Sequence, residues 1–241
     1  MLIAPAVITT NSPSASSIIT TSVAARWNLI VLLAYRRVGE ARSVLRLQSV
    51  TSTQDVARPL PIGSLVVAEH QTAGRGRRDR RWESPAGTAL LVSFVLDPNP
   101  LLSLAAGVAA AEACGSGVRL KWPNDLLLRG AKLGGILVEA TPTKAICGIG
   151  INLTWSPPGA AMLNEDRDGL LEKLSVALRR WSSARPEAVL ARWRELSDTL
   201  GRQVRVELPG RVIEGTAEAI GPDGELIVDG VAVRVGSVIH L

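Results

Sequence analysis

The densest group of chemically active side chains in this 241-residue sequence is a run of arginines that follows Gly74. Five arginines lie between Arg75 and Arg81 with Asp79 as the one acid among them, so this run carries a net +4 of the chain's formal charge of +5. Guanidinium groups packed this densely repel one another, and the neighbouring glycines hold no preferred backbone conformation. We therefore interpret residues 71–86, called the arginine loop below, as mobile when empty and ordered around a phosphate or a carboxylate.

Lysine is rare in this sequence, which favours a specific role for the lysines that lie near other polar residues. Only four of the 27 basic residues are lysines, and two of them, Lys121 and Lys132, stand inside short segments rich in polar residues and glycine. A compact ammonium differs from a planar guanidinium in geometry and in how readily its pKa shifts. Coincidence is the competing interpretation of so small a number.

Four more segments have residue types that suit a binding site: residues 52–54, 121–125, 132–135 and 148–152. Each falls at the end of an expected strand or in a loop, where a scaffold presents functional groups. Glycines 134, 135, 148 and 150 lie within expected strands and mark places where another backbone or a ligand comes close. Fixed cations, a carboxylate, exposed backbone amides and a tryptophan suit a phosphate-bearing nucleotide better than a nucleic-acid groove.

The elements that must position these segments predict an α+β fold. Apolar runs predict strands at residues 44–50, 64–69, 88–96, 118–122, 132–139 and 144–153. Helical spacing of apolar residues predicts helices at residues 101–114, 166–181 and 186–200, and Ser52 is a hydroxyl cap for a further helix. In the last forty residues, short apolar runs separated by turn dipeptides predict a small β-barrel.

The ordered segments resemble the motifs of biotin protein ligases. Gly-Arg-Gly-Arg-Arg-Asp-Arg-Arg-Trp-Glu-Ser-Pro-Ala-Gly at 74–87, Lys-Trp-Pro-Asn-Asp at 121–125, Lys-Leu-Gly-Gly-Ile-Leu-Val-Glu at 132–139 and Gly-Ile-Gly-Ile-Asn at 148–152 follow the family's order. Ser-Thr-Gln at 52–54 resembles the family's Ser-Thr-Asn, and the likeness extends over residues 44–241. It implies a mixed central β-sheet with flanking helices, as in class II synthetases and biotin/lipoate ligases, followed by a small C-terminal SH3-like β-barrel.

The resemblance also implies an ATP-dependent reaction in two steps. Biotin and ATP would form biotinyl-5′-AMP and pyrophosphate, and the biotin would then pass to a lysine of the biotin carboxyl carrier domain of a biotin-dependent carboxylase. Lys132, Arg75 and Arg77 would be catalytic, and Asp125 would bind Mg²⁺. The biotin site would comprise Ser52, Thr53, Gln54, Gln71, Gly74, Arg75, Gly76, Arg77, Lys132 and Gly135. The ATP or adenylate site would comprise Arg77, Arg78, Arg80, Trp82, Lys121, Asn124, Lys132 and Asn152.

Two residues depart from the family's pattern. Asp79 stands where the family usually has glycine, and aspartate reaches positive φ more readily than most residues, though less freely than glycine. Gln54 replaces the usual asparagine and lengthens one side chain of the biotin pocket.

The domain organisation predicted is an N-terminal extension at 1–42, a catalytic domain at 43–200 and the barrel at 201–241. The extension is rich in Ser, Thr, Pro and Ala and shows no helix-turn-helix pattern, so we expect a ligase without DNA-binding activity. Two distant cysteines indicate a reducing, cytoplasmic location, and no apolar run approaches the ~20 residues needed to span a membrane. We expect a monomer or a homodimer.

Two other functions stay open on the sequence alone. A lipoate-type ligase shares the expected fold and the adenylation chemistry. A nucleic-acid-binding protein would explain a pI near 9.9, although the basic excess is confined to one loop and aromatic residues make up only 3% of the chain.

Overall fold

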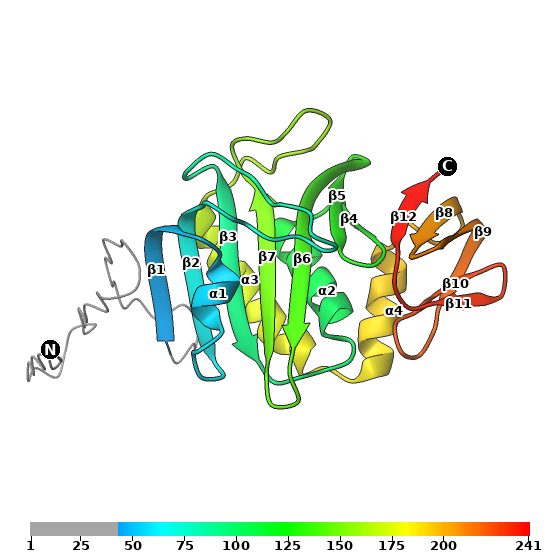
Figure 1. Cartoon of the computed structure of the whole chain (residues 1–241), viewed down its shortest axis with the longest axis horizontal. Helices are drawn as coiled ribbons and strands as arrows, with labels where there is room; N and C mark the ends of the chain where they lie inside the picture. The colour runs from blue at the N-terminus through cyan, green and yellow to red at the C-terminus, as the bar shows by residue number, and fades with distance from the viewer. Residues whose placement is uncertain (1–42) are drawn as a thin grey trace, which may run out of the picture.

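A computed structural model of the chain describes residues 43–241 and has a seven-stranded β-sheet at its centre (Figure 1). β1 and β2 are parallel, and all other neighbouring strands of this sheet are antiparallel, so the sheet is mixed as predicted. Its spatial order is β1-β2-β3-β7-β6-β5-β4. The bounds are β1 (Ser43–Val50), β2 (Ser64–Gln71), β3 (Ala89–Leu96), β4 (Val118–Lys121), β5 (Asp125–Leu128), β6 (Ala131–Ala140) and β7 (Ala145–Asn152). The interpretations of residues 1–42 lie outside the described residues.

Helices cover the two faces of the sheet unequally, which leaves room for a site on one of them. α2 (Leu102–Cys114), α3 (Arg167–Ser182) and α4 (Pro186–Leu196) cover one face, and among the helices of residues 43–241 only the short α1 (Thr53–Ala57) lies on the other (Figure 1). Alternation along β2 serves both faces, because Leu65 and Val67 join the large core while Val66 and Ala68 join a smaller core beneath α1. None of the helices in residues 43–241 is long and apolar enough to cross a bilayer.

The start of α1 was predicted correctly, but the predicted end of α4 is wrong. The Ser52 hydroxyl accepts from the backbone N–H of Gln54 at the start of α1, as the sequence predicts. Helix α4 ends at Leu196 instead of residue 200. The chain turns away there because the backbone N–H of Asp198 donates to the carbonyl of Leu120 at 2.8 Å, which attaches residues 197–198 to the edge strand β4.

The C-terminal residues form a second, smaller sheet of five antiparallel strands in the order β11-β10-β9-β8-β12. The bounds are β8 (Gln203–Leu208), β9 (Arg211–Ile220), β10 (Leu226–Val228), β11 (Val231–Val233) and β12 (Ser237–His240). The α+β fold class with a small C-terminal β unit is confirmed. β11 and β12 are the two edges of this sheet, so the pairings of the described strands form an open sheet, and closure into the expected SH3-like barrel is not seen among them.

The small sheet is attached to the motif at residues 121–125. The indole N–H of Trp122 donates to the carbonyl of Gly224 at 2.9 Å, and Gly224 packs against Leu101 and Leu104 at the start of α2. This contact places β12 beside the open face of the central sheet (Figure 1). The division into domains at residues 43–200 and 201–241 stays a prediction.

Candidate active site

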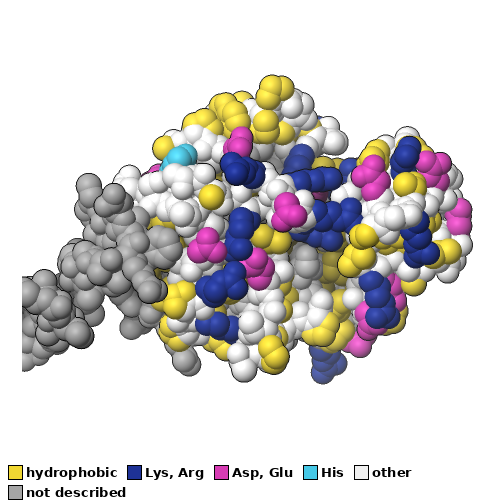
Figure 2. Space-filling model, viewed as in Figure 1, with side chains coloured by type: hydrophobic (Ala, Val, Ile, Leu, Met, Phe, Trp, Pro, Cys, Tyr) yellow, Lys and Arg dark blue, Asp and Glu magenta, His cyan; other side chains and the backbone are white. Residues whose placement is uncertain are grey.

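A cavity of about 150 Å³ lies between the arginine loop, the open face of the central sheet and the start of β12. In Figure 2, Lys and Arg side chains gather in this region between the two sheets. Small-molecule sites commonly measure roughly 300–1,000 Å³. Gln54, Trp82 and Lys132 are among the side chains that line this smaller cavity. Entry of two substrates therefore requires the loop or the lining side chains to move.

The arginine loop folds back on itself over the cavity. The backbone N–H of Gly76 donates to the carbonyl of Arg80 at 2.7 Å, and the N–H of Trp82 donates to the carbonyl of Gly74 at 3.0 Å. A Cβ atom at Gly74 would lie 2.3 Å from the carbonyl oxygen of Trp82, so this turn requires glycine there. Asp79 has φ of 57°, a conformation that glycine adopts without cost and that aspartate tolerates better than most residues.

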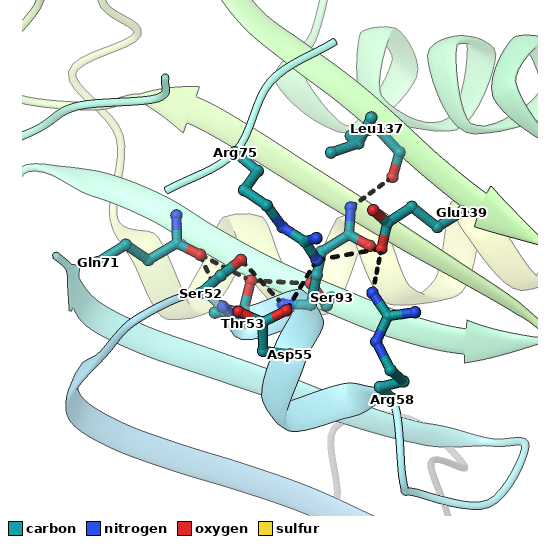
Figure 3. A network of polar contacts seen from close by, with 10 residues as sticks. Ser52, Thr53, Asp55, Arg58, Gln71, Arg75, Ser93, Leu137 and Glu139 are labelled. Carbon is teal, nitrogen blue, oxygen red and sulfur yellow. Dashed lines mark hydrogen bonds and ion pairs between the residues drawn. The ribbon is translucent and has the colours of Figure 1, made fainter. Parts of the chain in front are cut away.

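The arginines of the loop differ in the charge of their partners. Arg75 forms ion pairs with Asp55 at 3.0 Å and Glu139 at 3.1 Å (Figure 3). Arg77 instead donates to the neutral side-chain oxygen of Asn124 at 3.2 Å. Burial, followed by the neighbouring guanidinium of Arg78, lowers the pKa of Arg77. The expectation that the loop arginines meet no anion until a ligand arrives is therefore wrong for Arg75, because the protein itself supplies two carboxylates.

Two further arginines of the loop contact the C-terminal sheet. Arg78 and Arg80 both donate to the hydroxyl of Ser237, at 3.3 Å and 3.2 Å. A serine hydroxyl neutralises neither guanidinium. Neither guanidinium forms an ion pair with a carboxylate of residues 43–241, so both lie where a polyanion would be attracted.

A group of buried polar side chains lines the opposite end of the cavity (Figure 3). The side-chain oxygen of Gln71 accepts from the backbone N–H and the hydroxyl of Thr53, at 2.7 Å and 3.0 Å, and the Thr53 hydroxyl also meets Ser93 at 2.8 Å. Gln54 donates to the carbonyl of Leu137 at 2.9 Å, while its Oε1 is buried without a partner among the described residues. Such an unpaired acceptor is available to an N–H group of a bound ligand.

Three glycines on β6 and β7 leave a bare surface that two site residues cover. Gly135 pairs with Gly150 across the two strands, and Gly148 points to the same face two residues earlier. A Cβ at Gly148 would lie 2.7 Å from Nε2 of Gln54, and one at Gly150 would lie 2.7 Å from Cε2 of Trp82. The Cε2 atom of tryptophan has three bonded neighbours in the ring plane, and these block an approach from within that plane. The Cβ position of Gly150 must therefore lie over a face of the ring. Trp82 thus rests one face on Gly150 and can offer the other to a planar ligand.

The motif at residues 121–125 and Lys132 bring two ammonium groups to one carboxylate. Nζ of Lys132 lies 2.7 Å from Oδ1 of Asp125. Lys121 is half-buried, and burial is the main reason that its pKa is lowered; the nearby Lys132 lowers it further, and Asp125 opposes the shift. The side chain of Asn124 is fixed by donating to the carbonyl of Ile136 at 2.8 Å.

The structure brings most of the predicted site residues together around this cavity. Gly74 and Asn152 are the two of them that do not line it. Gly74 lies in the turn of the loop, and the buried Asn152 donates to the carbonyl of Ala161 at 2.9 Å, which ties β7 to the following loop. The assignment of each lining residue to a ligand stays a prediction.

Sequence reasoning missed three residues whose side chains contact arginines of the loop. Asp55 follows the 52–54 motif directly and Glu139 ends the 132–139 motif, so their places beside known motifs were the available signal. Ser237 had no such signal, because it lies in an ordinary-looking segment of the C-terminal sheet and reaches the cavity only through the tertiary fold.

A metal site made of protein ligands alone is not present in residues 43–241, where no group of three or more His, Cys, Asp or Glu side chains could hold an ion. Asp125 is the one acidic residue among the described residues that line the cavity. A single carboxylate suits a Mg²⁺ ion that takes its other ligands from water and phosphate.

Comparison with known proteins agrees with this fold and site. Residues 44–154 match the profile of the Biotin/lipoate A/B protein ligase family, which defines the class. Residues 199–240 match the Biotin protein ligase C terminal domain. A biotin--[acetyl-CoA-carboxylase] ligase of Mycobacterium tuberculosis is 37% identical over 213 residues, which cover 74% of this chain and 79% of that protein. The chain belongs to the biotin protein ligase family.

Other relatives differ in how much of their length is matched. The bifunctional ligase/repressor BirA of Escherichia coli is 33% identical over 201 residues, which cover 70% of this chain and 63% of that protein. A structure of the biotin protein ligase from Aquifex aeolicus in complex with biotin and ATP matches with a TM-score of 0.72 and 26% identity, covering 83% of this chain and all of that one. The Leishmania major enzyme in complex with biotinyl-5-AMP matches with a TM-score of 0.61 and 27% identity, covering 83% of this chain and 97% of that one.

Proposed function

We propose that this chain activates biotin with ATP and transfers it to a lysine of a biotin carboxyl carrier domain. In the first step, a carboxylate oxygen of biotin bonds to the α-phosphorus of ATP, and the bond to pyrophosphate breaks. In the second, the lysine amine attacks the acyl carbon, AMP leaves and the amine loses a proton. The observation that carries the proposal is the convergence of cationic side chains and a tryptophan face beside a pocket of buried polar groups.

The first step brings a carboxylate to a polyanion, so its main barrier is charge repulsion that fixed cations can lower. Lys132 lies between the polar pocket and the loop and is the group we assign to the reacting carboxylate and α-phosphate. Arg77, Arg78 and Arg80, whose contacts described above are to neutral groups, receive the phosphates. Mg²⁺ bound through Asp125 would supply additional neutralisation of the phosphate charge.

The polar pocket suits the head group of biotin. The unpaired Oε1 of Gln54 and the hydroxyls of Ser52 and Thr53 can pair with the N–H and C=O groups of its ureido ring. The face of Trp82 that is turned away from Gly150 suits the adenine. Because the arginine loop covers the cavity, it also limits the access of water to the mixed anhydride, which would otherwise hydrolyse.

Several observations favour this function over the two alternatives. The match to the Biotin protein ligase C terminal domain supports biotin over lipoate as the acid. The arginines gather at one cavity rather than forming an extended basic face, which argues against a nucleic-acid groove. The names of relatives that modify acetyl-CoA carboxylase support a carboxylase carrier domain as the acceptor.

The test is transfer of labelled biotin to a biotin-carrier domain with ATP and Mg²⁺, with pyrophosphate release measured separately for biotin and for lipoate. We expect Lys132→Ala to lower adenylate formation by about a hundred- to a thousandfold, the usual cost of losing one positioned electrostatic group. Lys173→Ala is the matched control, because Lys173 is exposed on α3 and pairs with Glu165. Lipoate-dependent pyrophosphate release without a response to biotin would refute biotin as the substrate.

A further inference from the structure

Arg75 differs from its neighbours in the arginine loop because two acidic side chains hold it. One nitrogen of its guanidinium, Nη2, lies 3.0 Å from Oδ1 of Asp55 and 3.1 Å from Oε2 of Glu139 (Figure 3). Asp55 belongs to α1 and Glu139 to β6, so the two carboxylates come from elements on either side of the pocket. The guanidinium of Arg58 shares Oε2 of Glu139 at 3.0 Å.

The place of Arg75 in the loop makes its attachment important. It lies between Gly74 and Gly76, the two residues whose backbone packs directly against the returning strand of the loop at Trp82 and Arg80. Residues 74–76 are called the neck of the loop below. The neck has little room to move toward the returning strand, because a Cβ at Gly74 or Gly76 would lie 2.3 Å or 3.1 Å from a carbonyl oxygen of that strand. Fixing the Arg75 side chain to α1 and β6 therefore fixes the position of the neck over the cavity.

The charges divide the loop into two functional parts. The guanidinium of Arg75 is neutralised by protein carboxylates, whereas the contacts of Arg77, Arg78 and Arg80 described above are to neutral oxygens. The Nε atom of Arg75 is also buried without a partner among the described residues, so this side chain keeps one donor free at the edge of the pocket.

We propose that Asp55 and Glu139 are positioning residues for the adenylation step, which act by anchoring Arg75 and thereby holding the neck of the arginine loop over the biotin pocket. The inference rests on the proposed function and adds to it a division of labour within the loop. Arg75 ties the loop to the pocket, and the arginines after it remain available for the phosphates. Glu139 has the larger effect of the two, because its loss leaves the guanidiniums of Arg58 and Arg75 facing each other without the carboxylate between them.

The experiment uses the full chain and isosteric variants. Asp55→Asn and Glu139→Gln keep the shape of each side chain and remove its charge, and Glu172→Gln on the exposed face of α3 is the matched control. Pyrophosphate release is measured while biotin and ATP are varied in turn. Exposed ion pairs contribute modestly, so we expect kcat/KM for biotin to fall roughly two- to fivefold in Asp55→Asn. A larger fall is expected in Glu139→Gln, and none in Glu172→Gln.

A double-mutant cycle separates positioning from a general structural role. If Asp55 acts through Arg75, then Asp55→Asn has no further effect on kcat/KM in a chain that already carries Arg75→Gln. The inference is overturned if both carboxylate variants match the wild type. It is also overturned if Asp55→Asn lowers kcat/KM by the same factor with and without Arg75. Absence of biotin-dependent pyrophosphate release from the wild type would instead refute the proposed function.

Discussion

Two glycines on strand β7 should control the two substrates separately. A Cβ at Gly150 would lie 2.7–3.0 Å from three ring atoms of Trp82, and a Cβ at Gly148 would lie 2.7 Å from Nε2 of Gln54. Neither glycine has positive φ, so alanine fits the backbone at both positions. Gly150→Ala should therefore displace the tryptophan that we assign to the adenine. Gly148→Ala should displace the glutamine that we assign to biotin.

The expected magnitudes follow from these contacts. Overpacking in a rigid core costs about 1–3 kcal/mol. Here the ring at Gly150 lies at the end of a loop side chain and can move aside. Replacing glycine also stabilises by about 0.4–1 kcal/mol through the unfolded state. The melting temperature of Gly150→Ala should thus stay within about 4 °C of the wild type. Loss of stacking on Trp82 costs about 1–3 kcal/mol, so KM for ATP should rise roughly five- to a hundredfold.

The assay is pyrophosphate release, with ATP varied at saturating biotin and then biotin varied at saturating ATP. Gly150→Ala should raise KM for ATP and leave KM for biotin near the wild-type value, and Gly148→Ala should do the reverse. In a chain that already carries Trp82→Ala, Gly150→Ala should have no further effect on KM for ATP. The assignment of Trp82 is refuted if Gly150→Ala leaves KM for ATP unchanged, or if both variants affect both substrates alike.

Two other variants test the contacts of the C-terminal sheet. Ser237→Ala removes the hydroxyl that accepts hydrogen bonds from Arg78 and Arg80. Because exposed hydrogen bonds contribute about 0.5–1 kcal/mol, KM for ATP should rise roughly two- to fivefold. An unchanged KM would contradict a role for Ser237 in ordering the loop. Burial, followed by the charges of Lys121 and Arg202, lowers the pKa of His240 to about 4 from an ordinary value of 6.5. Between about pH 6.5 and pH 4, the folded chain therefore holds this imidazole neutral while the unfolded chain takes up a proton. The free energy of unfolding does not depend on this group above about pH 6.5, and it decreases as the pH falls from 6.5 toward 4. His240→Gln should therefore flatten the pH dependence of denaturant unfolding between pH 4 and 6.5. A curve parallel to that of the wild type would show that His240 does not cause it.

Much of the site could be predicted because its residues lie in short local motifs. The motif at residues 74–87 was recognised from the order of its glycines, arginines and tryptophan, whereas the positive φ of Asp79 became visible only in the structure. The strands predicted at residues 132–139 and 144–153 correspond to β6 and β7, because the apolar pattern and the short turn that define them are local in sequence. The end of α4 at Leu196 was not predicted, because the contact between Asp198 and Leu120 that ends the helix joins residues distant in sequence.

By itself, the sequence determined the α+β class, the segments that form the site and the excess of positive charge at one loop, since all three depend on residue type and local spacing. Only the tertiary structure decided which of those charges the protein neutralises. It sets two carboxylates from separate elements against Arg75 and leaves Arg78 and Arg80 against a serine of the C-terminal sheet. The physical reason is that electrostatic interaction depends on distance in space, and residues far apart along the chain become neighbours only when the sheets assemble.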